Sequence, residues 1–394
     1  MKKGKQVSLS NKLLPLLLVS ALAGCSTLTE QVSTGFGLFA ASSVAVKAEL
    51  SEFKPSAKAT LSWRQQMGSA GGYVFAPAIF KGSIFAAGQD GQIARFDADS
   101  GRQIWRVDAG RKLSSGVGTS DNLVLAGTAK GEVLAFDFDG KPLWQAKVTS
   151  EVLSAPQAAE ETVVVRTGDG RIFGLDAKDG KRKWVYQRAT PALVLRSYAG
   201  VAITRGAVLA GFSGGKLVAL NLANGNVGWE ATVAQPRGAT ELERIADITS
   251  LPVVDGSMVC AVAFQGRVAC FDLLSGNQLW AREISSVAGL VVDNRTLYVS
   301  DANGAVHALD KNNGASIWKQ DKLSGRQLTA PSVVNGYVAV ADYQGYAHFL
   351  SRDDGAFAAR IATDGSAAVA PPLLSNGNLL LQTGNGGVFA LSVQ

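Results

Sequence analysis

Reactive side chains are scarce in this sequence: its 394 residues include two histidines and three cysteines. No Cys/His cluster has the spacing of a zinc site, and no serine or cysteine stands in a nucleophile-elbow motif. Glycine-rich tracts such as Gly211–Gly215 suit hairpin turns rather than phosphate loops. Aspartate-rich turns such as Asp97–Gly101 lack the full oxygen ligand set of a calcium loop. The sequence therefore predicts no catalytic group, no metal and no cofactor, and a protein that is not an enzyme.

A concentrated positive charge and a helical apolar period are also missing. The formal net charge is +6, but four of the 38 Lys and Arg residues lie in residues 1–24, which hold no acid. The rest of the chain therefore carries 34 basic against 32 acidic residues, a charge near +2. This balance argues against nucleic-acid binding, which needs a concentrated basic face. Beyond residue 24 no long stretch has a 3.6-residue apolar period, so we expect little helix.

From Gly91 onward the sequence repeats one motif, Gly-x-[Ile/Val/Leu]-x-x-[Phe/Leu]-[Asp/Asn]-x-x-x-Gly-x-x-x-Trp. Five copies place glycine and tryptophan 14 residues apart, and a sixth, Gly131–Trp144, is one residue shorter. A seventh copy has Ala359 in place of tryptophan, and an eighth begins at Gly386 and stops before any tryptophan. Thr60–Arg64 resembles the end of a repeat without its beginning. Stacked units with a period of about 40 residues are typical of binding surfaces rather than catalytic clefts.

Each unit contains four short apolar runs bounded by glycine and aspartate, as in Val152–Ala158, Thr162–Gly168, Arg171–Asp176 and Lys181–Gln187. Eight such units predict an all-β fold, an eight-bladed β-propeller of four-stranded antiparallel blades over residues 59–394. We expect the N-terminal strand to complete the last blade, which closes the ring without a free sheet edge.

The seven tryptophans are spread one per unit, so none is spare for a special role. We predict that they lock neighbouring blades together by stacking and hydrogen bonding. They are Trp63, Trp105, Trp144, Trp184, Trp229, Trp280 and Trp318.

Both histidines, His307 and His348, lie three residues after the repeat's glycine. The same position is apolar in the other units, which makes it a packing position. We therefore predict two histidines tolerated in the core; the alternative is a pair of metal ligands. The apolar counterparts are Ala94, Leu134, Phe173, Val218, Ala269 and Phe389.

Residues 1–24 are predicted to be a lipoprotein signal peptide, with four lysines followed by an apolar core, Leu13–Leu22, too short to span a membrane. The Leu22–Cys25 segment resembles the lipobox of bacterial lipoproteins, so cleavage would leave Cys25 as a lipid-modified N-terminus; the alternative is an ordinary signal peptide. The next residue is serine rather than aspartate, which by resemblance to lipoprotein sorting implies the periplasmic face of the outer membrane. Residues 25–58 are predicted to be a lipid-anchored linker.

Cys260 and Cys270 lie on consecutive predicted strands, on either side of a turn at Gln265–Gly266. A two-residue turn would place them on opposite faces of the hairpin, whereas a three- or five-residue loop would make them face each other. In an oxidising compartment a cross-strand disulfide would then form; the alternative is two small buried thiols.

Two connections between units are longer than the others. The distance from tryptophan to the next repeat glycine is 31 residues after Trp184 and 37 after Trp229, against 24 to 28 elsewhere. Both connections join an outer strand to the next inner strand, so they leave the same face of the ring. Because they follow consecutive units, we expect them to be neighbours.

The residues of these two connections suit a protein contact. The first, Arg188–Tyr198, is expected to expose Leu193, Leu195 and Arg196. The second, Gln235–Asp247, is expected to form a short helix. Apolar residues ringed by paired charges are typical of interfaces. The alternative is that the two connections only pack on each other, with Arg196 bridging to an acid of the second. The charged residues predicted on the second connection are Glu241, Glu243, Arg244 and Asp247.

The repeat resembles the blade motif of the quinoprotein alcohol dehydrogenases, which share its Ala-x-Asp-x-x-x-Gly-x-x-x-Trp core. Those enzymes also have adjacent cysteines over the cofactor and an acidic calcium site. This chain has no adjacent cysteines and is much shorter, so the resemblance implies the fold and not the activity.

Over its whole length the chain also resembles the BamB family, propeller lipoproteins of the outer-membrane β-barrel assembly machinery. The resemblance lies in the lipobox, the tether, the repeat and the pair Leu193–Ser197 and Gly238–Ile248. It implies a non-catalytic scaffold that binds the periplasmic POTRA domains of BamA, the barrel-forming core subunit. Contacts map to Leu193, Leu195, Arg196 and Asp247, and we add Glu243 and Arg244; Thr249 stands where the family often has another acid.

Two other functions stay open: a periplasmic quinoprotein-like ligand-binding protein or enzyme, and a lipoprotein adaptor for another envelope complex. Whether exposed strand edges also bind unfolded outer-membrane proteins by adding a strand is likewise open.

Overall fold

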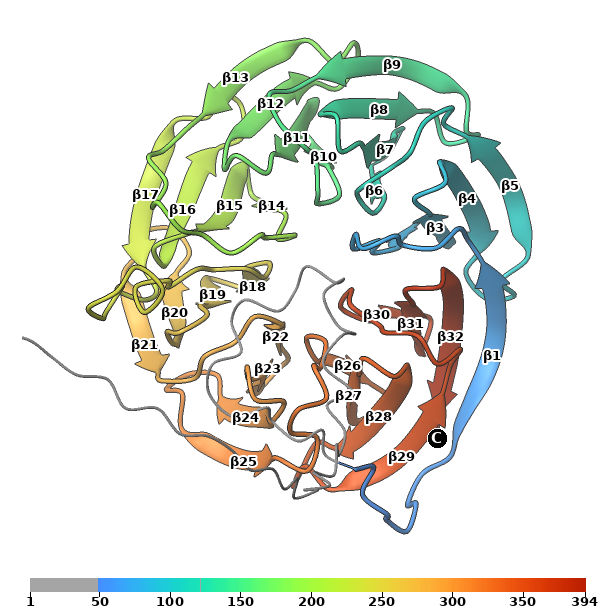
Figure 1. Ribbon diagram of the computed structural model, residues 1–394, viewed down its shortest axis with the longest axis vertical. Coiled ribbons are helices and arrows are strands. Elements are labelled where there is room, and N and C mark those ends of the chain that lie inside the picture. Colours follow the sequence, from blue (N-terminus) through green and yellow to red (C-terminus); the bar gives the residue numbers. More distant parts are fainter. Residues whose placement is uncertain (1–48, 121) are drawn as a thin grey trace, which may run out of the picture. The chain divides into compact units, whose positions relative to one another are not determined.

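The computed structural model describes residues 49–120 and 122–394. These residues form eight four-stranded antiparallel sheets arranged around a central axis (Figure 1), and no helix occurs among them. The predicted all-β, eight-bladed propeller is confirmed. The predicted signal peptide, Cys25 and most of the predicted linker lie outside the described residues.

Each blade consists of four adjacent strands that follow one another from the central axis outward. From the innermost strand to the outermost, blades 1 to 4 are β2 (Ala78–Phe80), β3 (Ser83–Ala87), β4 (Gln92–Asp97), β5 (Gln103–Asp108); β6 (Gly118–Thr119), β7 (Val124–Gly127), β8 (Glu132–Phe136), β9 (Pro142–Lys147); β10 (Gln157–Ala159), β11 (Thr162–Arg166), β12 (Ile172–Asp176), β13 (Arg182–Tyr186); and β14 (Ala202–Thr204), β15 (Ala207–Phe212), β16 (Lys216–Asn221), β17 (Val227–Thr232). In the same order, blades 5 to 8 are β18 (Val253–Asp255), β19 (Met258–Val262), β20 (Val268–Asp272), β21 (Gln278–Arg282); β22 (Gly289–Val292), β23 (Thr296–Ser300), β24 (Val306–Asp310), β25 (Ser316–Gln320); β26 (Ser332–Val334), β27 (Tyr337–Ala341), β28 (Tyr346–Ser351), β29 (Phe357–Ala362); and β30 (Leu373–Ser375), β31 (Asn378–Gln382), β32 (Gly387–Val393), β1 (Ala59–Gln66).

Burial along the strands explains the apolar patterns of the sequence. The second and third strands of a blade are covered on both sides by neighbouring blades, so β11 and β12 are almost continuously buried. Outer strands such as β13 are covered on one side and alternate between exposed and buried residues. The innermost strand is shorter than predicted: β10 begins at Gln157, directly after Pro156, which has no N–H to donate to a sheet.

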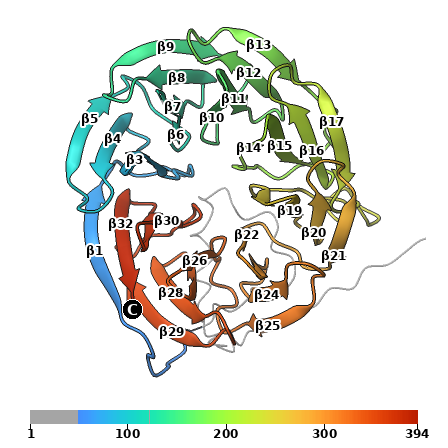
Figure 2. The same ribbon diagram turned by 180° about the vertical axis from the view of Figure 1, so that it is seen from behind.

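The N-terminal strand closes the ring, as predicted. β1 pairs antiparallel with β32, from Ala59 opposite Val393 to Gln66 opposite Gly387, with a bulge after Leu61. Figure 2 shows the two strands side by side from behind, with the C-terminus next to the start of β1. The last blade therefore joins residues from both ends of the chain.

Seven of the eight junctions between blades share one contact. The indole Nε1 of the outer-strand tryptophan donates to a backbone carbonyl of the next blade, over 2.7–3.3 Å. Its ring lies on the glycine of the turn between the third and fourth strands of that blade. A Cβ on Gly225, for example, would lie 2.6 Å from Cε3 of Trp184, and its φ of 73° also favours glycine. The stacked pairs are Trp63–Gly101, Trp105–Gly140, Trp144–Gly180, Trp184–Gly225, Trp229–Gly276, Trp280–Gly314 and Trp318–Gly355.

The eighth junction, between blades 7 and 8, explains why the seventh repeat has Ala359 instead of tryptophan. Blade 8 has no turn between its third and fourth strands, because β32 and β1 are the two ends of the propeller chain. A tryptophan there would have no turn glycine to stack on. Residues 51–58 fill the position instead: Ser56 N and Ala57 N donate to Ala358 O over 3.0 and 3.1 Å. The ring of Phe53 stacks 5.3 Å from that of Phe357.

Replacing Phe53 with alanine is expected to lower the free energy of unfolding by about 1–2 kcal/mol, because the ring is partly buried rather than in the core. The variant also loses the contact with the Arg360 guanidinium, whose Cζ lies 5.0 Å from the ring centroid. Urea unfolding of Phe53→Ala and of the exposed control Lys54→Ala measures the difference. Equal midpoints for the two variants would show that this segment does not stabilise the junction.

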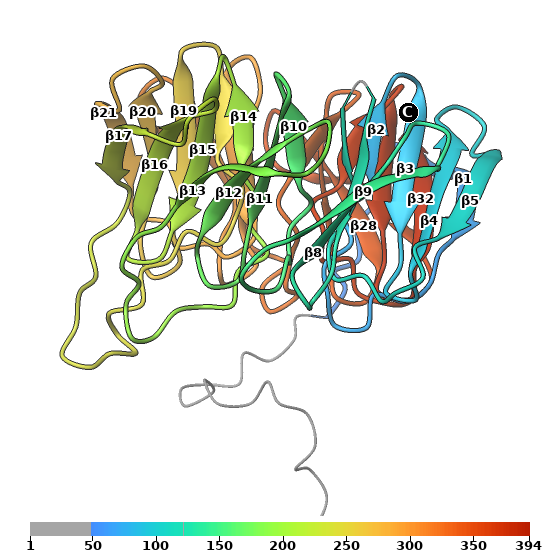
Figure 3. The ribbon, with the colours of Figure 1, turned by 90° about the horizontal axis from the view of Figure 1, so that it is seen from above.

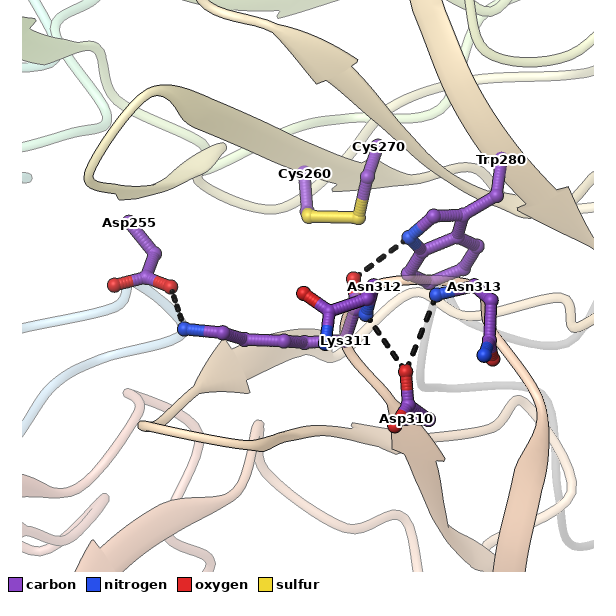
Figure 4. The surroundings of a disulfide bond; sticks show 8 residues. All are labelled: Asp255, Cys260, Cys270, Trp280, Asp310, Lys311, Asn312 and Asn313. Atoms are coloured by element: carbon purple, nitrogen blue, oxygen red, sulfur yellow. Dashed lines mark hydrogen bonds and ion pairs between the residues drawn. A yellow bond between two sulfur atoms is a disulfide. The ribbon is translucent and has the colours of Figure 1, made fainter.

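A disulfide joins Cys260 and Cys270 within blade 5. The two cysteines are directly opposite each other on β19 and β20, and residues 263–267 form the five-residue loop between the strands. Of the two alternatives left by the sequence, the bridge is the one found. Both cysteines are fully buried near Trp280, whose indole bonds to Lys311 O of blade 6 (Figure 4).

Candidate functional site

We call the two long connections the first loop, residues 187–201 between β13 and β14, and the second loop, residues 233–252 between β17 and β18. Strands alternate in direction within a blade, so both loops leave the same end of the ring. In Figure 3 the second loop extends beyond the blades at the lower left. This end of the propeller is termed the loop face.

The second loop contains a single turn, Glu241–Arg244, and not the short helix predicted. Thr240 and Glu243 form the reciprocal contacts of a helix start: Glu243 N donates to Thr240 Oγ1 over 3.3 Å, and Thr240 N donates to Glu243 Oε2 over 3.0 Å. The hydrogen bond from Thr240 N, followed by one from Ala239 N to the same carboxylate oxygen, lowers the pKa of Glu243.

Two features end this turn before a helix develops. The side-chain amide of Gln265, in blade 5, is oriented so that its oxygen and its nitrogen each face suitable partners. In this orientation the nitrogen donates to the carbonyls of Leu242, Glu243 and Ile245 over 2.9–3.2 Å. A continuing helix would need those carbonyls for itself. Residues 245–248 are then all buried, which one face of a helix cannot achieve.

Asp247 is the residue that connects the two loops. Its side chain is 3% exposed. Oδ2 accepts a hydrogen bond from Leu195 N over 2.7 Å, and Oδ1 accepts one from Gly214 N over 3.1 Å. The carboxylate of the second loop therefore holds the backbone of the first loop against the turn between β15 and β16.

A partly buried cation, Arg166, lies near this carboxylate. Burial lowers the pKa of Arg166, at the end of β11, to about 10, while the charge of Asp247 opposes the shift. Arg166 stays charged at neutral pH, and its Nη1 is buried without a hydrogen-bond partner. Its guanidinium and that of Arg188 lie 5.1 and 5.4 Å from the ring centroid of Phe212. Asp247 thus compensates a charge as well as fixing the loop.

Arg196 is held by aromatic rings. Its Cζ lies 5.7 Å from the ring centroids of both Tyr73 and Tyr198. Tyr73 belongs to the connection between β1 and β2, and Tyr198 Oη donates to Gly72 O of that connection over 3.1 Å. Among the described residues Arg196 makes no ion pair with an acid of the second loop, so the loops pack on each other through Asp247 instead.

The residues predicted to bind a partner therefore differ in how they are presented. Leu193 is 44% exposed and Arg196 is exposed, whereas Leu195 is partly buried beside Asp247. Glu243 and Arg244 are exposed but engaged within their own loop, since Arg244 Nε donates to Gly238 O over 3.0 Å. All six lie in the two loops of the loop face, where Asp247 of the second loop contacts Leu195 of the first.

Sequence reasoning missed Tyr73, Tyr198, Gln265 and Leu251. A signal existed for the last of these: Leu251 lies two residues before an inner strand and is 46% exposed. Six other blades have a small residue or proline at that position, so a large aliphatic side chain departs from the repeat. The counterparts are Ala76, Gly116, Ala155, Gly200, Ala330 and Pro371.

The two histidines lie in the blades, not on the loop face. His348 is fully buried, and its Nε2 lies 2.9 Å from Asp342 Oδ2. Arg360 Nε donates to His348 Nδ1 over 3.1 Å, so the neutral ring carries its proton on Nε2. Burial would raise the pKa of Asp342, but hydrogen bonds from His348 and Arg326 are among the contacts that hold it below its usual value. The core position predicted for both histidines is confirmed for His348, whereas His307 is only partly buried; each is hydrogen-bonded to an aspartate rather than only packed.

Lowering the pH from 7.5 to 5.5 is expected to destabilise the protein through His348. Burial lowers the pKa of His348 in the folded state, whereas in the unfolded chain it is about 6.5. The unfolded state therefore binds more protons over this window, and the contribution of neutral His348 is present above about pH 6.5 and declines below it.

The melting temperature at both pH values measures this effect. We expect a smaller decrease for His348→Gln, whose amide stays neutral. His307→Gln, at the matching position of blade 6 beside Asp301, is the matched variant that removes a histidine elsewhere in the propeller. A decrease in His348→Gln as large as in the parent would contradict the assignment.

In the described part of the chain, no three His, Cys, Asp or Glu side chains gather as ligands of a metal ion would. The same residues contain no helix with the length and apolar character of a membrane span.

Comparison with known proteins places these features in a family. A family model described as "Outer membrane protein assembly factor BamB" matches residues 89–320. The protein of that name from Nitrosomonas eutropha is 46% identical over 385 residues, covering 96% of this chain and 94% of the relative. The crystal structure of BamB from Moraxella catarrhalis has a TM-score of 0.78 at 26% identity, covering 85% of this chain and 100% of that one.

A quinohemoprotein alcohol dehydrogenase from Comamonas testosteroni is also similar in structure. Its TM-score is 0.69 at 13% identity, covering 84% of this chain and 76% of the enzyme. At this identity the similarity shows the fold alone.

Proposed function

The chain belongs to the family of outer membrane protein assembly factor BamB, and we propose that it is a non-catalytic scaffold of the outer-membrane β-barrel assembly complex. In this proposal the loop face binds the periplasmic POTRA domains of BamA. The protein is held at the periplasmic face of the outer membrane by lipid on Cys25, and it supports insertion of outer-membrane proteins without performing chemistry itself.

The observation that carries the proposal is the double hydrogen bond of Asp247. A side chain buried in one loop fixes the backbone of another at Leu195, between two candidate contact residues. A loop that only filled space would not need a buried carboxylate, whose desolvation costs free energy unless its hydrogen bonds are satisfied. The arrangement supports a surface whose shape is set before a partner arrives.

The chemistry of this surface indicates the kind of partner it would fit. Leu193 and Val194 are adjacent aliphatic residues of the first loop, and they are 44% and 46% exposed. The guanidinium of Arg196 follows two residues later. Aliphatic contacts beside an exposed arginine suit a folded domain that presents an apolar strip next to a carboxylate. Ordering costs on binding are small when the loop is already held in place.

The experiment that tests the proposal is a calorimetric titration of the mature protein, kept in detergent, with the purified POTRA domains of the cognate BamA. Saturable binding at one to one, with a Kd in the micromolar range or tighter, is expected for an interface of ordinary size. Absence of heat and of any shift in sedimentation at high micromolar concentration would reject the scaffold function with this partner. Capture of a different envelope complex would then favour the adaptor hypothesis.

A further inference from the structure

Two connections far apart in the sequence meet on the loop face. Tyr198, in the first loop, and Gly72, between β1 and β2, are 126 residues apart, yet the phenol of one donates to the carbonyl of the other. Figure 1 shows the connections that lead into blade 1 and into β14 pointing toward each other near the central axis of the ring. Arg196 lies where they meet. We call Gly72, Tyr73, Arg196 and Tyr198 the clasp.

From this geometry we propose that Tyr73 is a positioning residue for Arg196, so that blade 1 takes part in partner recognition by blades 3 to 5. The inference rests on the proposed function for its consequence in binding. Its physical content, the immobilisation of Arg196 by Tyr73, stands on the structure of the free protein.

The connection that carries Tyr73 is itself firmly anchored. Ala70 N donates to Gly384 O of blade 8 over 2.8 Å, and Tyr73 N closes a turn onto Ala70 O over 3.0 Å. Val74 forms an isolated bridge with Ser115, in the connection between β5 and β6, and Phe75 is 3% exposed. Gly72 adopts a φ of 86°, which the turn needs. The ring of Tyr73 therefore extends from a backbone segment that these contacts hold in place.

Apart from the rings of Tyr73 and Tyr198, the Arg196 side chain has no comparable anchor among the described residues. It is an exposed side chain with four rotatable bonds, and no ion pair fixes it among the described residues. Immobilising such a side chain on binding costs about 0.5–1.5 kcal/mol. Two rings at equal distance hold the guanidinium by cation–π attraction in the free protein. Asp247 fixes the preceding residue, so backbone and side chain are each held by a different contact.

The rings of Tyr73 and Tyr198 make different kinds of contact in the clasp, which distinguishes it from ordinary packing. Tyr198 ties the loops together through its hydroxyl group, whereas the hydroxyl of Tyr73 has no part in the contact with Arg196. The proposal therefore predicts that the Tyr73 ring matters and that its hydroxyl does not. If Tyr73 only stabilised the fold, changing its ring would not specifically affect Arg196.

The first test is an NMR measurement on the free protein, without a partner. The Nε–Hε signal of Arg196 in a nitrogen-15 spectrum is assigned by its loss in Arg196→Lys. Ring currents displace this signal, so Tyr73→Ala is expected to move it toward the position of exposed arginines, and Tyr73→Phe is expected to leave it in place. A signal that does not move in Tyr73→Ala overturns the inference, whatever the POTRA titration shows.

The second test is a double-mutant cycle on binding to the POTRA domains. Tyr73→Ala is expected to weaken binding about 3- to 10-fold, and Tyr73→Phe not at all. In an Arg196→Ala background Tyr73→Ala should have no further effect, because its target is gone. An equal loss in both backgrounds would overturn the positioning role. If the parent protein does not bind, the proposed function fails while the spectrum still decides the inference.

Discussion

Arg196→Glu is expected to weaken binding to the POTRA domains about 100-fold or more, with little change in stability. The side chain is exposed and held by two tyrosine rings, so its charge is available to a partner carboxylate. Reversing the charge removes that attraction and adds repulsion, and truncation or reversal of a central arginine commonly costs more than about 2 kcal/mol at an interface. The dissociation constant from calorimetry at fixed ionic strength measures the loss.

The matched control is Arg205→Glu, a charge reversal at another exposed arginine of the same propeller. Arg205 lies in the turn between β14 and β15, at the opposite end of β14 from the first loop. It therefore changes the net charge equally without touching the loop face. Equal weakening by both variants would indicate a general electrostatic effect, and unchanged binding by Arg196→Glu would move the contact elsewhere on the propeller.

Trp184→Ala is expected to have the largest effect on stability, about 3–5 kcal/mol. The ring is 8% exposed and stacks on Gly225 of the next blade, and its Nε1 donates to Leu222 O over 2.9 Å. The substitution removes the apolar contact, the hydrogen bond and the filling of the space between blades 3 and 4. Chemical unfolding monitored by circular dichroism measures the change.

Two further substitutions separate these contributions. Trp184→Phe keeps a ring on the glycine but leaves Leu222 O without its donor, and about 1–3 kcal/mol is expected. Val185→Ala alters the adjacent residue, which is 45% exposed, and should change stability by no more than about 0.5 kcal/mol. A Trp184→Ala midpoint close to that of Val185→Ala would show that the indole does not lock the blades.

Much of the fold could be predicted from the sequence, because a repeat encodes each blade separately. The position of Trp63 without a preceding repeat was enough to predict ring closure by β1. The lengths of the two loops were enough to place Leu193 and Arg196 on one face. The reason is local: strand periodicity, turn glycines and repeat spacing are read over a few residues.

Other features depend on which residues approach one another in space. Asp247 looked like a contact residue in the sequence, but it is buried because the first loop closes over it. The predicted helix was wrong because Gln265 caps the turn from a different blade. The disulfide depended on a loop of five residues rather than two, a choice that the residue types left open.

The number of blades, the manner of closure and the face from which the two long loops leave the ring could therefore be predicted from the sequence alone, because each follows from a spacing repeated along it. What holds the site in shape was not: Asp247 on Leu195, Gln265 under the second loop, and Tyr73 against Arg196 emerge in the folded ring. These contacts join residues from different blades. Their energies depend on side-chain geometry and burial, which closure of the ring creates and no local pattern records.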